Sequence, residues 1–227
     1  MKKKSVITIS SLIFLFILIY SFIPNKRIIN DFIFNFFKPP IKIQNEYSKA
    51  DKNKNDIPDS LDIVLGAKEE VKKKTPYKSN YYKDGYPPES ERVCTDVIWR
   101  AFKNADINLK DLIDEDIKNN AELYKRVNGK PDPNIDFRRV PNLDVFLKRY
   151  CLSLTTEVKC RDKENLSEWQ PGDIVVFLDG YEHIGIISDE RDKNGIPYVL
   201  HNTYPHANKM KLSWFSAPIH GHYRWKY

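Results

Sequence analysis

The chain has 227 residues, of which 41% are hydrophobic and 13% aromatic, so it can bury one sizeable core but is too short for two large domains. Its net charge is +6, yet without five basic residues that flank an apolar N-terminal run, the other 32 balance 31 acidic residues. The remainder therefore offers no basic surface for a polyanion, and we expect no nucleic acid among its partners.

Residues 5–24 carry no charge, and this run is as long as a helix that crosses the hydrocarbon core of a bilayer. A cleaved signal peptide is the alternative, but its apolar region is normally shorter and ends at small residues, whereas Phe22 and Ile23 close this one. We therefore expect residues 1–27 to form a membrane anchor with its N-terminus in the cytoplasm. In both cases the rest of the chain lies outside, either anchored to the cell membrane or secreted.

Residues 28–62 read as a juxtamembrane linker that contains a possible calcium loop. The run DKNKNDIPDSLD, residues 51–62, places oxygen-bearing side chains at the spacing of an EF-hand loop and resembles thrombospondin type 3 repeats. Asp56 stands where that loop needs Gly, and the last ligand is Asp rather than Glu. A polar linker that forms turns and caps the next helix is the equally weighted alternative. The candidate ligands of a structural Ca²⁺ are Asp51, Asn53, Asn55, Asp59, Asp62 and the carbonyl of Ile57.

Helical spacing of apolar residues dominates the first half of the remaining chain. Directly after Cys94, for example, Val97, Ile98 and Ala101 define a buried face, so the cysteine lies in the first helical turn. The predicted helices cover residues 63–74, 93–105, 109–127 and 140–150.

Short apolar runs separated by Gly- and Pro-containing turns dominate the second half. We expect consecutive antiparallel pairing of these strands, and therefore an α+β domain over residues 63–227, with helices first and the sheet after. The predicted strands cover residues 173–177, 183–188, 198–202 and 221–225.

Cys94 and His183 are the candidate nucleophile and base of a thiol enzyme. A helix N-terminus favours a thiolate and offers the Cys94 backbone N–H as an oxyanion donor, while an imidazole takes the thiol proton. Either His201 or Asn202 orients that imidazole, but the two point to opposite faces of a strand, and we favour His201. The alternative for Cys94 is an inert buried thiol. Two further cysteines, Cys151 and Cys160, are either paired or reduced.

The run PGDIVVFLDGYEHIGIIS, residues 171–188, resembles the strand pair of NlpC-type cell-wall peptidases. A closer resemblance covers residues 63–227, where VCTDVIWRAF, PDPNIDFRRVPNL, HIGIISD, LHN and GHYRW are similar to the bacterial family of domain of unknown function 1287. The resemblance implies a papain-like NlpC-type fold with Cys94 as nucleophile, His183 as base and His201 as orienting group. Thr95 follows the cysteine where Ser is more usual, and a helical insertion separates Cys94 from His183.

Three charged residues near these motifs have two interpretations each. Arg138 and Arg139 are candidates for binding a substrate carboxylate, or else form ion pairs. Asp96 is grouped with them as a candidate substrate-binding residue, or is simply a favourable charge in the first helical turn.

The sequence thus predicts a cysteine peptidase or amidase that needs no cofactor for catalysis and hydrolyses an amide in peptidoglycan stem peptides or a related envelope substrate. A lipid or ester acyl hydrolase or transferase on the same fold is one alternative. A non-catalytic, calcium-dependent envelope binding module is another. The sequence gives no prediction of oligomeric state.

Overall fold

The structure, a computed structural model, describes residues 38–227 of the chain. Residues 40–227 form one compact unit. The predicted anchor, residues 1–27, lies outside the described residues, and no helix in the described part is long and apolar enough to cross a membrane.

The helices lie close to where the apolar spacing predicts them. α3 begins at Asp59, earlier than expected, because Asp59 and Asp62 occupy its first turn, where the helix dipole favours negative charge. α5 ends at Asn119 rather than continuing to residue 127, because Asn120 leaves the helical conformation and donates its amide to the Asp116 carboxylate. The α-helices are α3 (Asp59–Lys73), α4 (Cys94–Asn104), α5 (Leu109–Asn119), α6 (Val140–Tyr150) and α7 (Lys163–Ser167); short 3-10 turns are η1 (Ala121–Leu123), η2 (Asp136–Arg138) and η3 (Leu212–Trp214).

One six-stranded antiparallel sheet has the order β1-β6-β2-β3-β4-β5, so the α+β prediction is confirmed. The expected consecutive pairing is wrong for the last strand, because β6 returns to pair with β2 instead of β4. The place beside β4 is taken by β5, whose sequence ANKMK alternates too weakly in polarity to predict an edge strand. The strands are β1 (Cys151–Ser153), β2 (Ile174–Phe177), β3 (His183–Arg191), β4 (Pro197–Asn202), β5 (Ala207–Lys211) and β6 (Gly221–Trp225).

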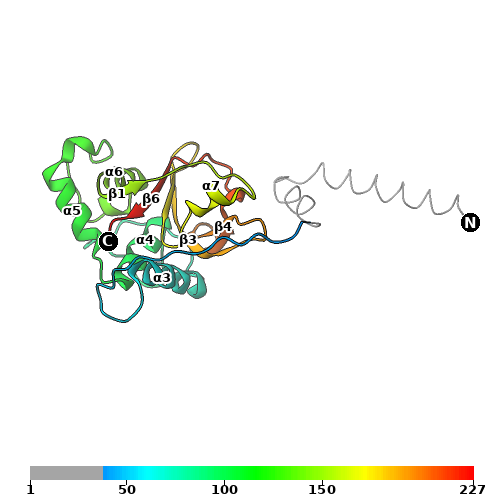
Figure 1. The fold of residues 1–227 in the computed structure, drawn as a ribbon. Coiled ribbons are helices and arrows are strands. Elements are labelled where there is room, and N and C mark those ends of the chain that lie inside the picture. The colour runs from blue at the N-terminus through cyan, green and yellow to red at the C-terminus, as the bar shows by residue number, and fades with distance from the viewer. Residues whose placement is uncertain (1–37) are drawn as a thin grey trace, which may run out of the picture. The chain divides into compact units, whose positions relative to one another are not determined.

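Two apolar cores lie on the two faces of the sheet, because successive strand residues point to opposite faces. The larger core holds Ile184 and Ile186 of β3 together with the buried faces of α3, α4, α5 and α6. The smaller core holds Ile187 of β3 with Phe177 and Phe215. Figure 1 shows α4 beside β3 and next to α3, where helix and strand are in contact.

The segment of residues 40–48, here called the strap, packs on the smaller core through Ile41 and Ile43. Its Ile41 N–H donates to the Lys193 carbonyl, and its Asn45 amide donates to the Asp189 carbonyl. The structure therefore places residues 40–62, assigned to a linker from the sequence, within the same compact unit as the predicted catalytic domain.

Candidate active site

Cys94 is the first residue of α4, as the apolar spacing predicts. Val97, Ile98 and Ala101 are completely buried against the sheet and α3, so the helix start is held firmly at the beginning of β3. The Cys94 side chain is free of any disulfide and only 6% exposed. A substrate can reach this thiol only after neighbouring side chains move.

Burial decides the protonation state of this thiol. Burial and, to a lesser degree, the nearby Asp96 charge raise the pKa of Cys94 to about 12, while the backbone N–H groups of Ile184, Thr95 and Cys94 act in the opposite direction. The sequence predicts a thiolate at this helix N-terminus, but in this state desolvation outweighs the helix-end donors. The structure therefore holds a neutral thiol.

His183 and His201 form a buried imidazole pair at the adjacent ends of β3 and β4. His183 Nε2 lies 2.8 Å from His201 Nδ1, and the two rings are perpendicular. Gly185 makes this approach possible, because a Cβ there would lie 2.4 Å from Val199 Cγ1 and 3.3 Å from the Cβ of His201. The glycine of the run HIGIIS thus has a structural purpose that the sequence pattern alone does not reveal.

Aromatic side chains surround the pair and keep water out. Phe215 contacts both imidazoles, and Tyr181 stacks on His183 with ring centroids 5.4 Å apart. Burial, with the charge of His201, lowers the pKa of His183 to about 3, and burial lowers the pKa of His201 to about 4, an effect that Asn208 only partly opposes. Both imidazoles are therefore neutral bases at physiological pH.

A neutral pair needs one donor and one acceptor across the nitrogen–nitrogen contact. If His183 carries its proton on Nε2 and donates to His201, its Nδ1 keeps a lone pair that can accept a proton. His201 then carries its own proton on Nε2, an atom that is buried and has no hydrogen-bond partner in the described chain. In the described chain neither His183 Nδ1 nor His201 Nε2 makes a hydrogen bond of standard geometry, although the Asn208 side chain lies near the His201 ring.

The thiol approaches this pair at the first residues of β3. The Ile184 backbone N–H acts on the Cys94 sulfur, and Ile184 shares the larger core with Cys94. Strand alternation turns the neighbouring His183 toward Phe177 and Phe215 of the smaller core. Among residues 38–227 no hydrogen bond joins the Cys94 thiol to an imidazole, so the resting arrangement brings the histidines together and leaves the thiol beside them.

The Asn202 side chain bonds to the backbone near Cys94 and not to His183. Its amide donates to the carbonyls of Arg92 and Thr75, at 3.2 and 3.5 Å. It thereby ties the end of β4 to the chain just before Cys94. The structure therefore brings His201 rather than Asn202 to His183.

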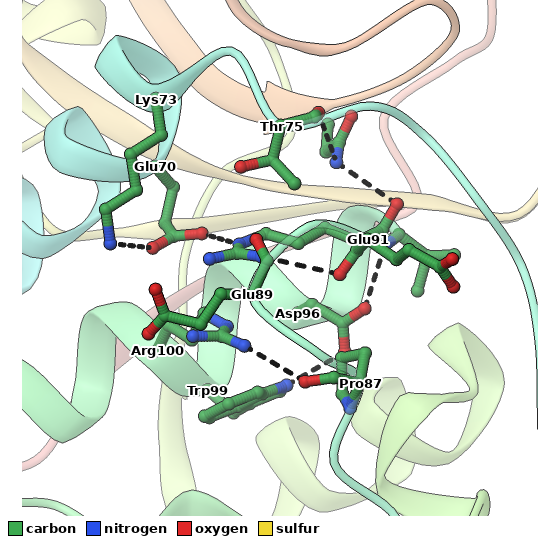
Figure 2. Close-up of polar contacts among 12 residues, drawn as sticks. Glu70, Lys73, Thr75, Pro87, Glu89, Glu91, Asp96, Trp99 and Arg100 are labelled. Atoms are coloured by element: carbon green, nitrogen blue, oxygen red, sulfur yellow. Dashed lines mark hydrogen bonds and ion pairs between the residues drawn. The ribbon is translucent and has the colours of Figure 1, made fainter. Parts of the chain in front are cut away.

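Asp96 and Arg138 form a buried, two-pronged ion pair behind the cysteine. Arg138 Nε and Nη2 donate to the two Asp96 carboxylate oxygens at 2.8 and 2.9 Å. The same carboxylate accepts from the Trp99 indole and from the Val93 backbone N–H, and Figure 2 shows Asp96 beside the Trp99 ring. Because Asp96 occupies the guanidinium fork, these two residues hold the start of α4 in place and present no free charge to a ligand.

Arg139 lies outside this arrangement. Its Nη1 contacts the Asp136 carboxylate at 3.1 Å and the Arg126 carbonyl at 3.2 Å, and its side chain is partly exposed. The pairing of Arg138 with Asp96 across 42 positions is invisible to sequence spacing, although both residues lie in the family motifs.

The candidate calcium loop is held together by its own side chains. The amides of Asn53 and Asn55 donate to the Asp62 carboxylate, and Asp56 has a φ of 66°, the left-handed conformation that Gly supplies in an EF-hand loop. The Lys52 backbone N–H donates to Asp59. Within residues 38–227 no cluster of three or more His, Cys, Asp or Glu side chains is arranged to hold a metal ion. Calcium binding stays a prediction, which calcium titration of the wild type against Asp62→Asn tests.

The two remaining cysteines differ in how far solvent reaches them. Cys151 is a free, buried thiol at the start of β1, and Cys160 is exposed. Burial raises the pKa of Cys151 to about 12. The structure thus contains no disulfide between them.

Taken together, the fold and the site define an α+β protein with a buried cysteine at a helix N-terminus and a histidine pair on two adjacent strands. The family model described as domain of unknown function 1287 (DUF1287) matches residues 64–225, and the chain belongs to this family. The uncharacterized protein YijF of Escherichia coli strain K12 is 36% identical over 174 residues, covering 73% of this chain and 82% of that protein.

Two crystal structures of an N-acetylmuramoyl-L-alanine amidase from Bacteroides uniformis ATCC 8492 are similar to this chain at 12% and 13% sequence identity. In each case the similarity covers 74% of this chain and 99% of the amidase, with a TM-score of 0.42.

Proposed function

We propose that this protein is a thiol hydrolase of papain-like NlpC type that cleaves an amide bond in cell-wall peptides or a related envelope substrate. The observation that carries the proposal is the buried contact of His183 with His201, at 2.8 Å, on a strand whose next residue, Ile184, reaches the sulfur of a cysteine that opens a helix. Buried histidine rings normally have both nitrogens bonded, whereas here His201 Nε2 makes no hydrogen bond of standard geometry in the described chain, and the nearby Asn208 side chain only partly offsets the burial of the ring.

In the proposed reaction, Cys94 transfers its thiol proton to His183 Nδ1 as the sulfur attacks the substrate carbonyl carbon. The tetrahedral intermediate collapses to a thioester when the carbon–nitrogen bond breaks, and the His183 imidazolium protonates the leaving amine. A water molecule then attacks the thioester and gives a proton to His183. Release of the carboxylic acid product returns the proton to the sulfur.

His201 acts in this scheme as a positioning residue. By accepting from His183 Nε2–H it selects the tautomer whose Nδ1 lone pair accepts the thiol proton, and it stabilises the imidazolium. The backbone N–H of Cys94 is the proposed first oxyanion donor, because the N–H groups of the first helical turn have no partner within the helix.

Substrate binding has to open the site, because Cys94 and His183 are 6% and 4% exposed. Tyr181 covers His183 from the turn between β2 and β3, and its hydroxyl pKa is raised to about 12 by burial and by the nearby Cys94. We therefore expect this turn to move when a substrate enters, which brings the thiol and the imidazole into hydrogen-bond distance.

Digestion of purified muropeptides tests the proposal. The full chain, the Cys94→Ala variant and the His206→Ala variant, a partly buried histidine outside the site, are incubated with muropeptides, and product masses are followed. New peptide fragments from the wild type and from His206→Ala, but not from Cys94→Ala, support a cysteine amidase and identify the bond. If the muropeptides stay unchanged in all three samples, peptidoglycan is excluded as the substrate. The same three proteins are then tested on lipid acyl esters.

We further propose that the domain works outside the cytoplasm, tethered through the apolar residues 5–24. The support is the length of this run and the basic residues at its two ends. Protease treatment of intact and lysed spheroplasts tests it, since an outward-facing domain is digested in both.

A further inference from the structure

A cavity of about 370 Å³ lies at the C-terminal end of α4, outside the Cys94–His183–His201 site. Its volume falls within the range of ligand pockets, about 300–1,000 Å³. Tyr86 and Trp99 form aromatic walls, Ile107 and Leu109 add apolar surface, and Lys103, Asp106 and Asn108 supply polar groups. No step of the proposed hydrolysis uses these residues.

The aromatic walls are rigid and form a corner. The rings of Tyr86 and Trp99 have centroids 4.9 Å apart and planes inclined at 59°, and Phe137 packs behind both. The Trp99 indole is anchored by its hydrogen bond to Asp96, at 2.9 Å, while Tyr86 is 43% exposed. Figure 2 shows that the Arg100 guanidinium lies beside Trp99, next to the Pro87 carbonyl to which it donates. An exposed ring on a fixed base is a surface on which a flat ligand can stack at little entropic cost.

The polar groups at the cavity suit a neutral ligand. Lys103 and Asp106 contribute one positive and one negative charge, and neither side chain has an ion pair within residues 38–227. The Asn108 side chain is held by Asp111 as the cap of α5. A cation is not the expected occupant, because Lys110 already lies over the rings of Tyr86 and Phe137 and is paired with Asp114.

A sugar ring of the N-acetylhexosamine type meets all these requirements. Its axial C–H bonds present an apolar face to an aromatic ring, while its hydroxyl and acetamido groups hydrogen-bond to a carboxylate and an ammonium. Trp99 lies five residues beyond Cys94 on the same helix, a rise of about 7.5 Å. The cavity and the thiol thus share one helix, and the comparison of glycan-linked with free peptides tests whether one substrate occupies both.

We propose that this cavity is a saccharide subsite that binds a neutral N-acetylhexosamine unit of the substrate. The inference rests on the proposed function for its biological meaning, but the binding itself is independent of hydrolysis. The site would give glycan-linked peptides a lower KM than free peptides without changing kcat.

The test measures binding of N,N′-diacetylchitobiose, a neutral disaccharide of this type, to the full chain carrying Cys94→Ala. Titration calorimetry compares the disaccharide affinity of this protein with that of versions that also carry Tyr86→Ala, Tyr86→Phe or Tyr47→Ala. Tyr47 serves as the control because it is a tyrosine of the strap with a similar exposure, 38%. We expect Tyr86→Ala to weaken binding about tenfold, while Tyr86→Phe and Tyr47→Ala bind as before. No binding, or binding that Tyr86→Ala leaves unchanged, overturns the proposal. If Tyr86→Ala fails to fold by circular dichroism, Asp106→Asn and Lys103→Met take its place, with an expected loss of about threefold each.

Kinetics of the wild type separate this proposal from the proposed function. If glycan-linked and free peptides are both cleaved with the same KM, the subsite is overturned and the hydrolase stands. If disaccharide binds in a Tyr86-dependent way but no peptide is cleaved, the subsite stands and the proposed amidase is overturned.

Discussion

The molecule contains two buried histidine sites that differ in how completely their hydrogen bonds are satisfied. His222 Nε2 contacts Asp173 at 2.9 Å and its Nδ1 contacts the Thr155 carbonyl at 2.8 Å, while Trp169 stacks on the ring at 3.8 Å. The pair of His183 and His201 instead has a buried Nε2 without a partner in the described chain. A fully bonded ring stabilises a fold, whereas an incompletely bonded ring can still exchange a proton.

Replacing His183 by Ala has the largest expected effect. Loss of the general base should lower kcat/KM for muropeptide hydrolysis by about 10²–10⁴-fold, because the thiol then has no proton acceptor. The melting temperature should fall as well, since truncation of a buried ring leaves a cavity among Phe177, Tyr181 and Phe215, so activity is compared per folded molecule. A His183→Ala variant that unfolds but keeps its activity per folded molecule would reverse the roles assigned to the two histidine sites.

Asp173→Asn should lower the stability of the protein but, unlike His183→Ala, leave its activity per folded molecule unchanged. Asp173 accepts from His222 and, through both oxygens, from Arg224, so the change leaves the Arg224 guanidinium and the His222 ring facing an uncharged amide. Removing one partner of a buried ion pair costs about 3–5 kcal/mol in the free energy of unfolding, measured by urea denaturation. Activity per folded molecule should be unchanged, and Glu157→Gln on the exposed surface serves as the control. A loss of stability below about 1 kcal/mol contradicts the structural role.

Acid should destabilise the protein through the same pair. His183 and His201 have pKa values of about 3 and 4 in the folded state, below the ordinary value of 6.5. The unfolded chain therefore binds more protons below pH 6.5, and the stability these groups contribute is present above that pH and lost as pH falls toward 4 and 3. Between pH 7 and 4 the wild type should lose roughly 10–20 °C more in melting temperature than the double variant His183→Phe, His201→Phe. Equal losses would mean that the pair is protonated in the folded protein.

The last prediction concerns the protonation state of the Cys94 thiol. With a Cys94 pKa of about 12, only about one molecule in 10⁵ carries a thiolate at pH 7. Alkylation of Cys94 by iodoacetamide, followed by peptide mass spectrometry, should accelerate about tenfold for each pH unit between 7 and 10. A rate that is already maximal at pH 7 would indicate a resting thiolate–imidazolium pair and contradict the neutral resting state.

Local signals in the sequence were sufficient for part of this arrangement. The buried face behind Cys94 fixes its place at a helix start, and the strand runs place His183 and His201 at neighbouring strand ends. Long-range packing decides the rest. The return of β6 to β2, the pairing of Arg138 with Asp96 and the close approach above Gly185 all join segments that are distant in sequence. The raised thiol pKa likewise depends on burial, which no residue spacing reports.

The strap determines how the domain responds to a pulling force at Pro40. Its bonds follow one another along the chain, from Ile41 to Lys193, from Asn45 to Asp189 and from Glu46 to the Gln170 side chain. A force that enters at Pro40 loads them one at a time, so the strap peels before strain reaches the far end of β3, where His183 lies. In a protein held at its N-terminal end, the strap would therefore detach under tension before the histidine pair is disturbed.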